Sequence, residues 1–379
     1  SVFTGIDTLI DQISQYYQYK FYKEPFQQFE KLYYFLMEKI EDESLKKELT
    51  DWFFSLRQNK QEEPYQFKKN LLIDLANIGG SMFAQAISAK GPNIHVSAAC
   101  ASATHALAVA EDWLRTNRCD RVIVIGGEDA ASKNQLEWIG STFLDMGIST
   151  TREKVTEAAL PYDERRNGTI IGSGAVSLIL EKESEAHQRG MKGQAYVLGT
   201  HISNSAFHPS RMDSEDIAEN MDRFVHTIEQ RYNLNKAEYT RSLLFMSHET
   251  YTPAVGGSAA SEVKALQTAY PQHYQNITIT NTKGYSGHTI GAGIEDAVMI
   301  KSMQQRKAPP IANLKQIPEE FKNLRFSKGE KQSFEYGLHF AAGFGSHFSM
   351  FFVQRIEEVK ALNNLEYSNW LKRISGLDN

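Results

Sequence analysis

The chain has 379 residues, 41% of them hydrophobic and 23% charged, which is an ordinary composition for a globular protein. Its formal net charge is −5 and it has no basic block, so we expect no nucleic acid partner. No apolar run approaches the ~20 residues of a membrane span, and two cysteines make no disulfide framework. We therefore expect a protein of the reducing cytoplasm, without a secretory leader and without a membrane partner.

Residues 11–70 are predicted to be helical. Aromatic and charged residues recur there at spacings of three to four, in QYYQYKFYKEPFQQFEKLYYFLMEKI and LKKELTDWFFSLRQNK. The aromatic stripe is more typical of a packing face than of a ligand site. A sheet, a neighbouring domain or a partner subunit could lie against it.

From about residue 71 the pattern becomes that of an α/β protein. Apolar runs predict strands in NIHVSAA (93–99), RVIVIGG, AVSLILEK, SLLFMSH, NITITNT, LHFAAGFG and HFSMFFVQR. Helix-period segments separate several of them, at 101–116, 210–234, 258–271 and 290–306. This alternation predicts a mixed or parallel sheet covered on both faces. Residues 94–116 and 276–306 follow the same strand–turn–helix pattern, which indicates a duplicated βα core.

Cys100 lies where the run 93–99 is predicted to turn into a helix, among alanines and serines. The free N–H groups and the positive end of a helix dipole stabilise a thiolate over a thiol, which would make this cysteine a nucleophile. Small neighbours would let a thioester approach the sulfur. Free cysteine is also common as a small buried hydrophobe, so the stretch alone leaves both interpretations open.

Two histidines come directly after predicted strands. His248 ends SLLFMSH, and His288 follows NITITNT with Lys283 five residues before it. Sites in α/β sheets are built at the carboxyl ends of strands, so both are candidates for the same site as Cys100. No cysteine–histidine cluster has metal-ligand spacing. The glycines of GTIIGSGAVS precede their strand, whereas a dinucleotide site needs the strand first.

Five stretches, in order along the chain, resemble motifs of the β-ketoacyl synthases (ketosynthases) of fatty acid and polyketide synthesis. They are KGPNIHVSAACASATHALAVA, LPYDERRNGTIIGSGAVSLILE, HETYTP, KGYSGHTIGAG and LHFAAGFGSHFSMFFV. The resemblance implies a β-ketoacyl-(acyl carrier protein) synthase, an acyltransferase that joins an acyl group to a malonyl-type thioester with loss of carbon dioxide. No metal or redox cofactor is implied, because the loss of carbon dioxide drives the reaction. The resemblance implies that the substrates are carried on the phosphopantetheine arm of an acyl carrier protein.

The resemblance also implies a role for each candidate residue. Cys100 would take the acyl group as a thioester, His248 and His288 would stabilise the enolate of the extender, and Lys283 would orient the histidine region. The backbone N–H groups of Cys100 and Phe344 would form the oxyanion hole, with the Phe344 ring as the gate of the acyl pocket. The substrate-binding positions implied by the motifs are Thr250, Thr252, Gly343 and Gly345.

The resemblance covers roughly residues 71–355 and implies the thiolase fold, an α/β fold of duplicated βαβαβ halves in five layers, α-β-α-β-α. We expect the first strand region to be missing and residues 11–70 to be a helical insertion. The expected organisation is 1–70 as the N-terminal part with this insertion, 71–240 as the half with the nucleophile, 241–355 as the half with both histidines, and 356–379 as a linker or extension. We interpret the chain as part of a multidomain synthase with neighbouring synthase domains.

Departures from the family pattern keep other interpretations open. Glu249 and Tyr251 replace two usual glycines in a loop expected to face the carrier arm. The acid nine residues after the second histidine is replaced by Ala297, while Glu295 and Asp296 lie just before it, so the usual lysine–glutamate pair is rebuilt or lost.

The alternative function is a non-catalytic, chain-length-factor-like partner subunit in a ketosynthase heterodimer. The presence of Cys100 and both histidines argues against it. A thiolase-type enzyme would need a second cysteine near the C-terminus, and Cys119 lies too early. The resemblance implies a homodimer, with a heterodimer as the alternative.

Overall fold

The computed structural model describes residues 2–58, 78–188, 191–253 and 258–357. The chain divides into two compact units, residues 1–95 and 96–379, and each is described by itself. The predicted helical segment 59–70 and the predicted extension from residue 358 onward lie outside the described residues. None of the described helices is both long enough and apolar enough to cross a membrane.

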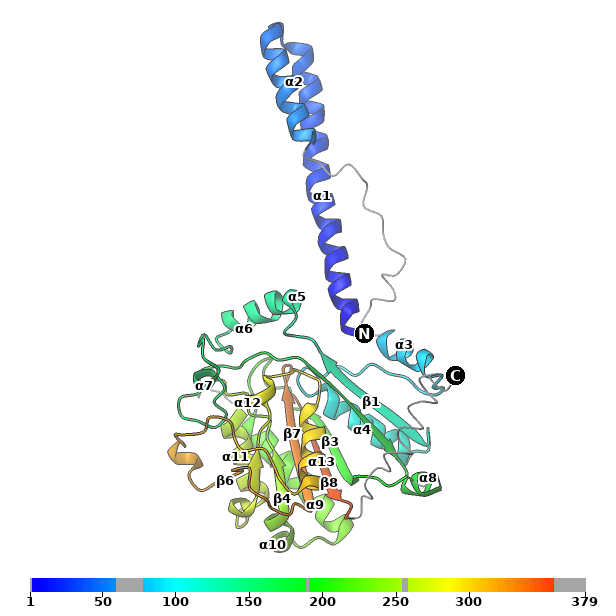
Figure 1. Ribbon diagram of the computed structural model, residues 1–379, viewed down its shortest axis with the longest axis vertical. Coiled ribbons are helices and arrows are strands. Elements are labelled where there is room, and N and C mark those ends of the chain that lie inside the picture. The colour runs from blue at the N-terminus through cyan, green and yellow to red at the C-terminus, as the bar shows by residue number, and fades with distance from the viewer. Residues whose placement is uncertain (1, 59–77, 189–190, 254–257, 358–379) are drawn as a thin grey trace, which may run out of the picture. The chain divides into compact units, whose positions relative to one another are not determined.

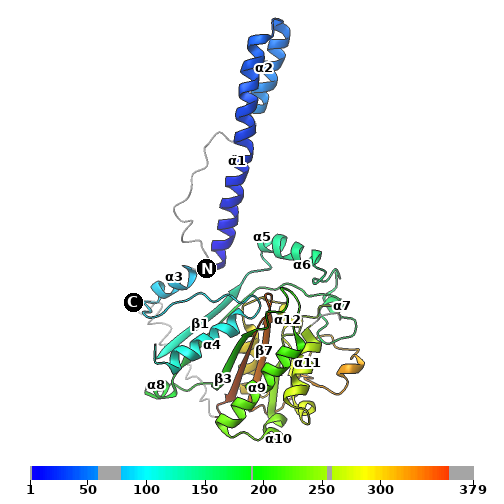
Figure 2. The ribbon, with the colours of Figure 1, turned by 180° about the vertical axis from the view of Figure 1, so that it is seen from behind.

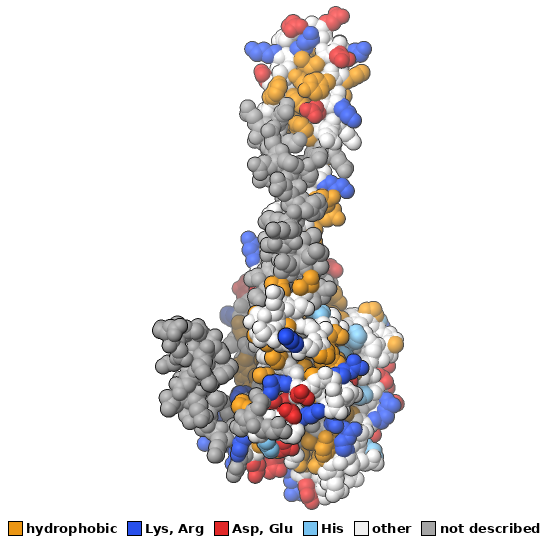
Figure 3. Space-filling view, turned by 90° about the vertical axis from the view of Figure 1, so that its right-hand side faces the viewer, with side chains coloured by type: hydrophobic (Ala, Val, Ile, Leu, Met, Phe, Trp, Pro, Cys, Tyr) orange, Lys and Arg blue, Asp and Glu red, His pale blue; other side chains and the backbone are white. Residues whose placement is uncertain are grey.

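The first unit contains a helical hairpin of α1 (Val2–Lys39) and α2 (Glu43–Gln58), followed by α3 (Gly79–Ala86). The Asp42 carboxylate accepts the N–H groups of Ser44 and Leu45, which caps the start of α2. The Tyr33 and Phe53 rings stack across the hairpin with centroids 4.1 Å apart. The helical prediction is confirmed up to residue 58. Where the side chains of this hairpin are described, hydrophobic and charged ones lie next to one another at its free end (Figure 3).

The second unit alternates strands and helices (Figure 1). Its strands are β1 (Arg121–Glu128), β2 (Gly174–Glu181), β3 (Ala195–Asn204), β4 (Leu243–Met246), β5 (Thr278–Thr280), β6 (Arg325–Phe326), β7 (Tyr336–Gly343) and β8 (His347–Arg355). Its longer helices are α4 (Ser102–Arg115), α9 (Ser214–Tyr232), α11 (Ser258–Ala269) and α13 (Ile294–Gln305). Its shorter helices are α5 (Lys133–Gln135), α6 (Ser141–Asp145), α7 (Val155–Ala158), α8 (Glu183–Gln188), α10 (Lys236–Tyr239) and α12 (Lys283–Ser286).

Six strands form the main sheet in the order β3-β8-β7-β4-β5-β6. The pairs β4–β7, β4–β5 and β5–β6 are parallel, whereas β8 pairs antiparallel with β7 and with β3. The predicted strands at 242–248, 276–282, 338–345 and 347–355 are therefore present. Because β4 and β5 are parallel neighbours, the residues that follow them emerge at the same edge of the sheet.

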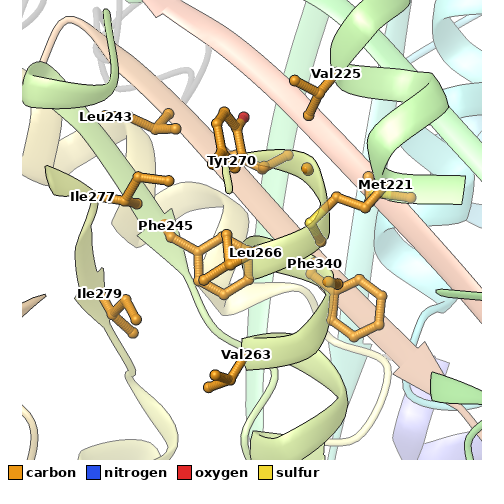
Figure 4. Close-up of a cluster of buried hydrophobic side chains, with 14 of the residues drawn as sticks. Met221, Val225, Leu243, Phe245, Val263, Leu266, Tyr270, Ile277, Ile279 and Phe340 are labelled. Atoms are coloured by element: carbon orange, nitrogen blue, oxygen red, sulfur yellow. The ribbon is translucent and has the colours of Figure 1, made fainter. Parts of the chain in front are cut away.

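Helices cover both faces of this sheet. Helices α9 and α11 lie on one face, in front of the sheet in Figure 2, and α13 lies on the other, in front in Figure 1. The apolar core under α9 and α11 joins side chains such as Met221, Leu266 and Phe245, which point toward one another in Figure 4. On the opposite face α4 contributes Leu107 and α13 contributes Met299 to a second core. Burial of this apolar surface is the main force that holds the sheet between its helices.

The strands β1 and β2 form a separate two-stranded antiparallel sheet. The strand predicted at 93–99 is wrong: this segment contains no strand, only the isolated bridge between Ala98 and Cys100. A strand needs a hydrogen-bonded neighbour, and no described strand pairs with residues 93–97. An apolar run was therefore not enough to form a strand here.

Candidate active site

Cys100 lies in a tight turn directly before α4, and it is half-buried. Ala99 adopts a left-handed φ of 48°, which is uncommon for a residue with a side chain and is found at strained turns. The Ser102 hydroxyl fixes the turn, because it donates to the Ala99 carbonyl at 2.6 Å and accepts the Ala98 N–H at 2.9 Å. The small residues around the cysteine thus shape its backbone as well as leaving space beside it.

The end of β7 packs directly on this turn. A Cβ atom at Gly343 would lie 2.4 Å from the Ala98 carbonyl oxygen and 2.9 Å from the Cys100 nitrogen. Such distances are shorter than van der Waals contact, so only glycine fits at this position. The last residue of β7 is therefore held against the backbone of the candidate nucleophile.

Both predicted histidines lie at this edge of the sheet and close to the cysteine. His288 Nε2 is 3.1 Å from Cys100 Sγ, across 188 residues of sequence. The His248 ring lies edge-on to the His288 ring, with centroids 5.8 Å apart. Both side chains are buried. The structure therefore brings together three residues that the sequence had placed only at strand ends and at a turn.

The lysine–glutamate pair that the sequence left open is present. Lys283 Nζ lies 2.6 Å from Glu295 Oε1, and both side chains are buried. The Lys283 ammonium holds the pKa of Glu295 down to about 2, against the effect of burial. Glu295 is therefore the acid that pairs with Lys283, two positions before Ala297.

Burial controls the protonation of the other three residues. It raises the pKa of the Cys100 thiol to about 11, although the Lys283 ammonium acts in the opposite direction. It lowers the pKa of His288 to about 3 and that of His248 well below its usual value, and Lys283 adds to both shifts. Burial thus opposes the thiolate that the sequence predicted at the start of α4, and it favours the neutral form of both imidazoles.

Glu249 and Tyr251, which replace two usual glycines, point inward from their loop. Both side chains are fully buried. The Glu249 carboxylate accepts from the Ser258 hydroxyl at 2.7 Å and from the Ala259 N–H at 2.8 Å, at the start of α11. The Tyr251 hydroxyl donates to the Lys283 carbonyl at 3.1 Å. The two bulky residues therefore brace the loop and the lysine from inside.

The remaining predicted residues lie around this centre. The Phe344 ring is partly exposed and lies edge-on to the Phe143 ring, with centroids 5.9 Å apart. Thr250 and Thr252 are half-buried in the loop after His248. Gly345 has a φ of 82° and donates its N–H to the Pro209 carbonyl at 2.7 Å. Their roles toward a substrate stay predictions.

Sequence reasoning missed other buried polar residues next to the site. The Glu262 carboxylate of α11 accepts a hydrogen bond from the backbone N–H of His248 at 3.2 Å and another from the Tyr162 hydroxyl at 3.2 Å. Burial raises the pKa of Glu262 to about 8. An acid within a run of small and apolar residues, as in SAASEVKAL, is the signal that could have marked it.

The fold has close counterparts among solved structures. A type II polyketide ketosynthase, bound to the hexaketide and in complex with its acyl carrier protein, matches with a TM-score of 0.69 and 20% identity, over 79% of this chain and 72% of that one. A β-ketoacyl synthase from Burkholderia phymatum STM815 matches with a TM-score of 0.66 and 20% identity, over 80% and 71% of the two chains. The predicted fold class, thiolase-like α/β, is thereby confirmed.

Sequence comparison identifies the family. Residues 46–186 match the N-terminal domain of β-ketoacyl synthases and residues 195–315 match the C-terminal domain. The chain belongs to the β-ketoacyl synthase family.

Curated relatives are distant and longer than the chain. The 3-oxoacyl-[acyl-carrier-protein] synthase 2 of Coxiella burnetii is 26% identical over 273 residues, which are 72% of this chain and 63% of that protein. Nodulation protein E of Rhizobium meliloti is 28% identical over 229 residues, 60% of this chain and 52% of that protein. The chain thus spans less than two thirds of the length of these relatives.

Proposed function

We propose that the chain acts as a β-ketoacyl-(acyl carrier protein) synthase, which joins a cysteine-bound acyl group to a malonyl-type extender. The observation that carries this proposal is the contact of 3.1 Å between Cys100 Sγ and His288 Nε2, beside His248 and the buried Lys283–Glu295 pair. A nucleophile within reach of a nitrogen base, with a second imidazole facing the same space, is the arrangement that acyl transfer needs. The names of the curated relatives support the same reaction.

In the first step Cys100 Sγ attacks the carbonyl carbon of an acyl thioester. The thiol proton passes to His288 Nε2 as the S–C bond forms, and it goes on to the sulfur of the departing carrier thiol. His288 Nε2, 3.1 Å from the sulfur, is the ring nitrogen within reach of this proton. The products are an acyl-cysteine thioester and the free carrier thiol.

In the second step a malonyl-type thioester takes the place of the carrier thiol. Its carboxylate leaves as carbon dioxide, and N–H groups of His248 and His288 hold the carbonyl oxygen on which negative charge develops. The resulting carbanion attacks the acyl carbon on Cys100, and the departing cysteine thiolate takes up a proton from solvent, which restores the thiol. A neutral imidazole donates a hydrogen bond without adding charge, so the lowered pKa values of both histidines suit this role.

The other roles follow from position. Gly343 holds the end of β7 against Cys100, so the N–H groups of Cys100 and Phe344 are candidates for the oxyanion hole. Phe344, with its ring on Phe143, would gate the acyl pocket, and Thr250, Thr252 and Gly345 would contact the carrier arm. The proposed reaction uses no metal or redox cofactor.

We propose an acyl carrier protein as the partner, as in the complex of the polyketide ketosynthase. A homodimer in the cytoplasm, acting in fatty acid or polyketide synthesis within a larger synthase, completes the proposal. Light scattering after size exclusion would test the dimer.

Intact-mass analysis after incubation with an acyl thioester tests the proposed function. We expect a single acyl adduct on the chain, absent from Cys100→Ala and retained in Cys119→Ala, which removes the other cysteine. Failure of the unmodified chain to take an acyl group would contradict the proposal, and the non-catalytic partner subunit would then be the better account.

A further inference from the structure

Thr104, Asp296 and His339 form a buried polar cluster next to the proposed active site, and none of the three has a role in the proposed reaction. Asp296 lies in the first turn of α13, one residue after Glu295. Its carboxylate accepts from His339 Nδ1 at 2.6 Å and from the Thr104 hydroxyl at 3.0 Å. All three side chains are at least 98% buried.

The cluster joins three elements that carry the site. Thr104 lies one turn into α4, four residues after Cys100. Asp296 lies next to Glu295, which pairs with Lys283. His339 is in β7, the strand whose last residue packs on the Cys100 turn. The two hydrogen bonds of Asp296 therefore tie the start of α4, the start of α13 and β7 to one another.

The two helix starts also touch through backbone that only glycine permits. A Cβ atom at Gly293 would lie 2.3 Å from the Ala103 Cβ, and one at Gly291 would lie 2.9 Å from the Ala99 carbonyl oxygen. The bond between Thr104 and Asp296 crosses this contact. A small shift of α13 along α4 would thus move Glu295, and with it the Lys283 ammonium, relative to Cys100.

Burying polar side chains among apolar ones carries a free-energy cost. His339 faces Met246 across the β4–β7 pairing, and Met246 belongs to the apolar core on the α4 side of the sheet. Its Nε2 atom has no hydrogen-bond partner among the described residues. Replacing buried polar partners by well-packed apolar side chains is often neutral or stabilising. Stability alone does not explain this cluster.

We propose that Thr104, Asp296 and His339 form a positioning cluster, which fixes the Glu295–Lys283 pair relative to Cys100 and so sets the reactivity of the thiol. The positioning role rests on the proposed function only because it takes Cys100 as the reacting group. None of the three residues touches the substrate in this account. They act through Lys283, whose charge favours the thiolate of Cys100.

The test is the rate at which iodoacetamide alkylates Cys100 at pH 8, followed peptide by peptide with Cys119 as the internal reference. The groups that act on the Cys100 thiol are Lys283, Glu295 and Glu128, with His288 in contact. Only the thiolate reacts. We expect Thr104→Val, which removes the hydroxyl at nearly constant shape, to slow alkylation of Cys100 by about 3- to 10-fold. Thr104→Ser should restore the rate.

A matched control lies at the other end of α4, where the Thr200 hydroxyl donates to the Glu111 carboxylate at 2.6 Å. Thr200→Val removes the same kind of bond and should leave the alkylation rate of Cys100 within 2-fold. In a Lys283→Met background, Thr104→Val should have no further effect. Equal slowing by Thr104→Val and Thr200→Val, or no slowing by Thr104→Val, would overturn the proposal. The measurement needs no carrier protein, so it stays readable even if no condensation is found.

Discussion

The two sheets of the larger unit differ in what covers them. In the six-stranded sheet every residue of β4 and β5 is buried, because helices pack on both faces. In the two-stranded sheet alternate residues are exposed, among them Ile123, Ile125 and Ile179. The covered sheet is thus a scaffold with fixed strand ends, whereas the two-stranded sheet leaves one apolar face open.

This difference explains which sheet positions the site. His248 and His288 follow β4 and β5 of the covered sheet. Cys100 lies outside the sheet, but the helix that follows it buries Leu107 and Ala110 in the same core as Met246 of β4. All three residues are therefore held by the covered sheet, and substitutions there should cost far more than substitutions in β1 and β2.

The largest loss of stability is expected in the centre of the covered sheet. Phe245→Ala would remove a ring that is fully buried between β4 and α11 (Figure 4). We expect a fall of about 3–5 kcal/mol in the free energy of unfolding, because a cavity remains where the ring was. Urea denaturation measures it. A loss below about 1 kcal/mol would mean that this core is not closely packed.

Lys283→Met should be nearly as costly. It leaves Glu295 buried without its cation, and breaking a buried pair in this way costs about 3–5 kcal/mol. The pKa of Glu295 is lowered in the folded chain, so its contribution is present above its usual value of 4.5 and is lost as the pH falls toward about 2. The free energy of unfolding of Lys283→Met should not show this fall at low pH. Lys264→Met, at the exposed pair with Glu215, is the control and should cost under about 1 kcal/mol.

The buried histidines predict a dependence of stability on pH. The folded-state pKa of His288 is lowered to about 3 from an ordinary 6.5, so the unfolded chain binds more protons between these values. Stability should fall as the pH decreases below about 6.5, by about 1.4 kcal/mol per pH unit for each such histidine. His288→Gln should reduce this slope by the contribution of one histidine, about 1.4 kcal/mol per pH unit. An unchanged slope would show that His288 is charged in the folded chain.

The smallest effect is expected on the open face of the two-stranded sheet. Ile179 is 63% exposed. Ile179→Thr keeps a β-branched side chain, so the free energy of unfolding should change by no more than about 0.5 kcal/mol. A cost close to that of Phe245→Ala would show that this face is covered in solution, and the comparison of the two sheets would fail.

The sequence predicted most strands of both sheets, including β1 and β2 of the two-stranded one. Runs of consecutive apolar residues identified β4, β7 and β8, which are buried on both faces. The same signal failed at 93–99, where pairing rather than hydrophobicity decides. It also missed β3, whose residues include glycine, threonine, histidine and asparagine and whose pairing with β8 shifts register at Gly199.

The site shows a similar limit. Strand ends and small residues around a turn marked Cys100, His248 and His288 as candidates, and the family resemblance supplied their predicted roles. They did not predict the protonation of the thiol, because desolvation depends on packing from segments nearly 200 residues away. The partners of Asp296 lie 192 and 43 residues from it in sequence, so no local spacing connects them.

The most direct test of the central claim is to mix the acylated chain with a malonyl-loaded carrier protein and weigh both proteins. The account predicts that the acyl mass leaves Cys100 and that the carrier gains it while losing carbon dioxide, which gives a 3-oxoacyl carrier. The His248→Ala chain should become acylated but discharge slowly. A chain that keeps its acyl group in the presence of the malonyl carrier would contradict the account.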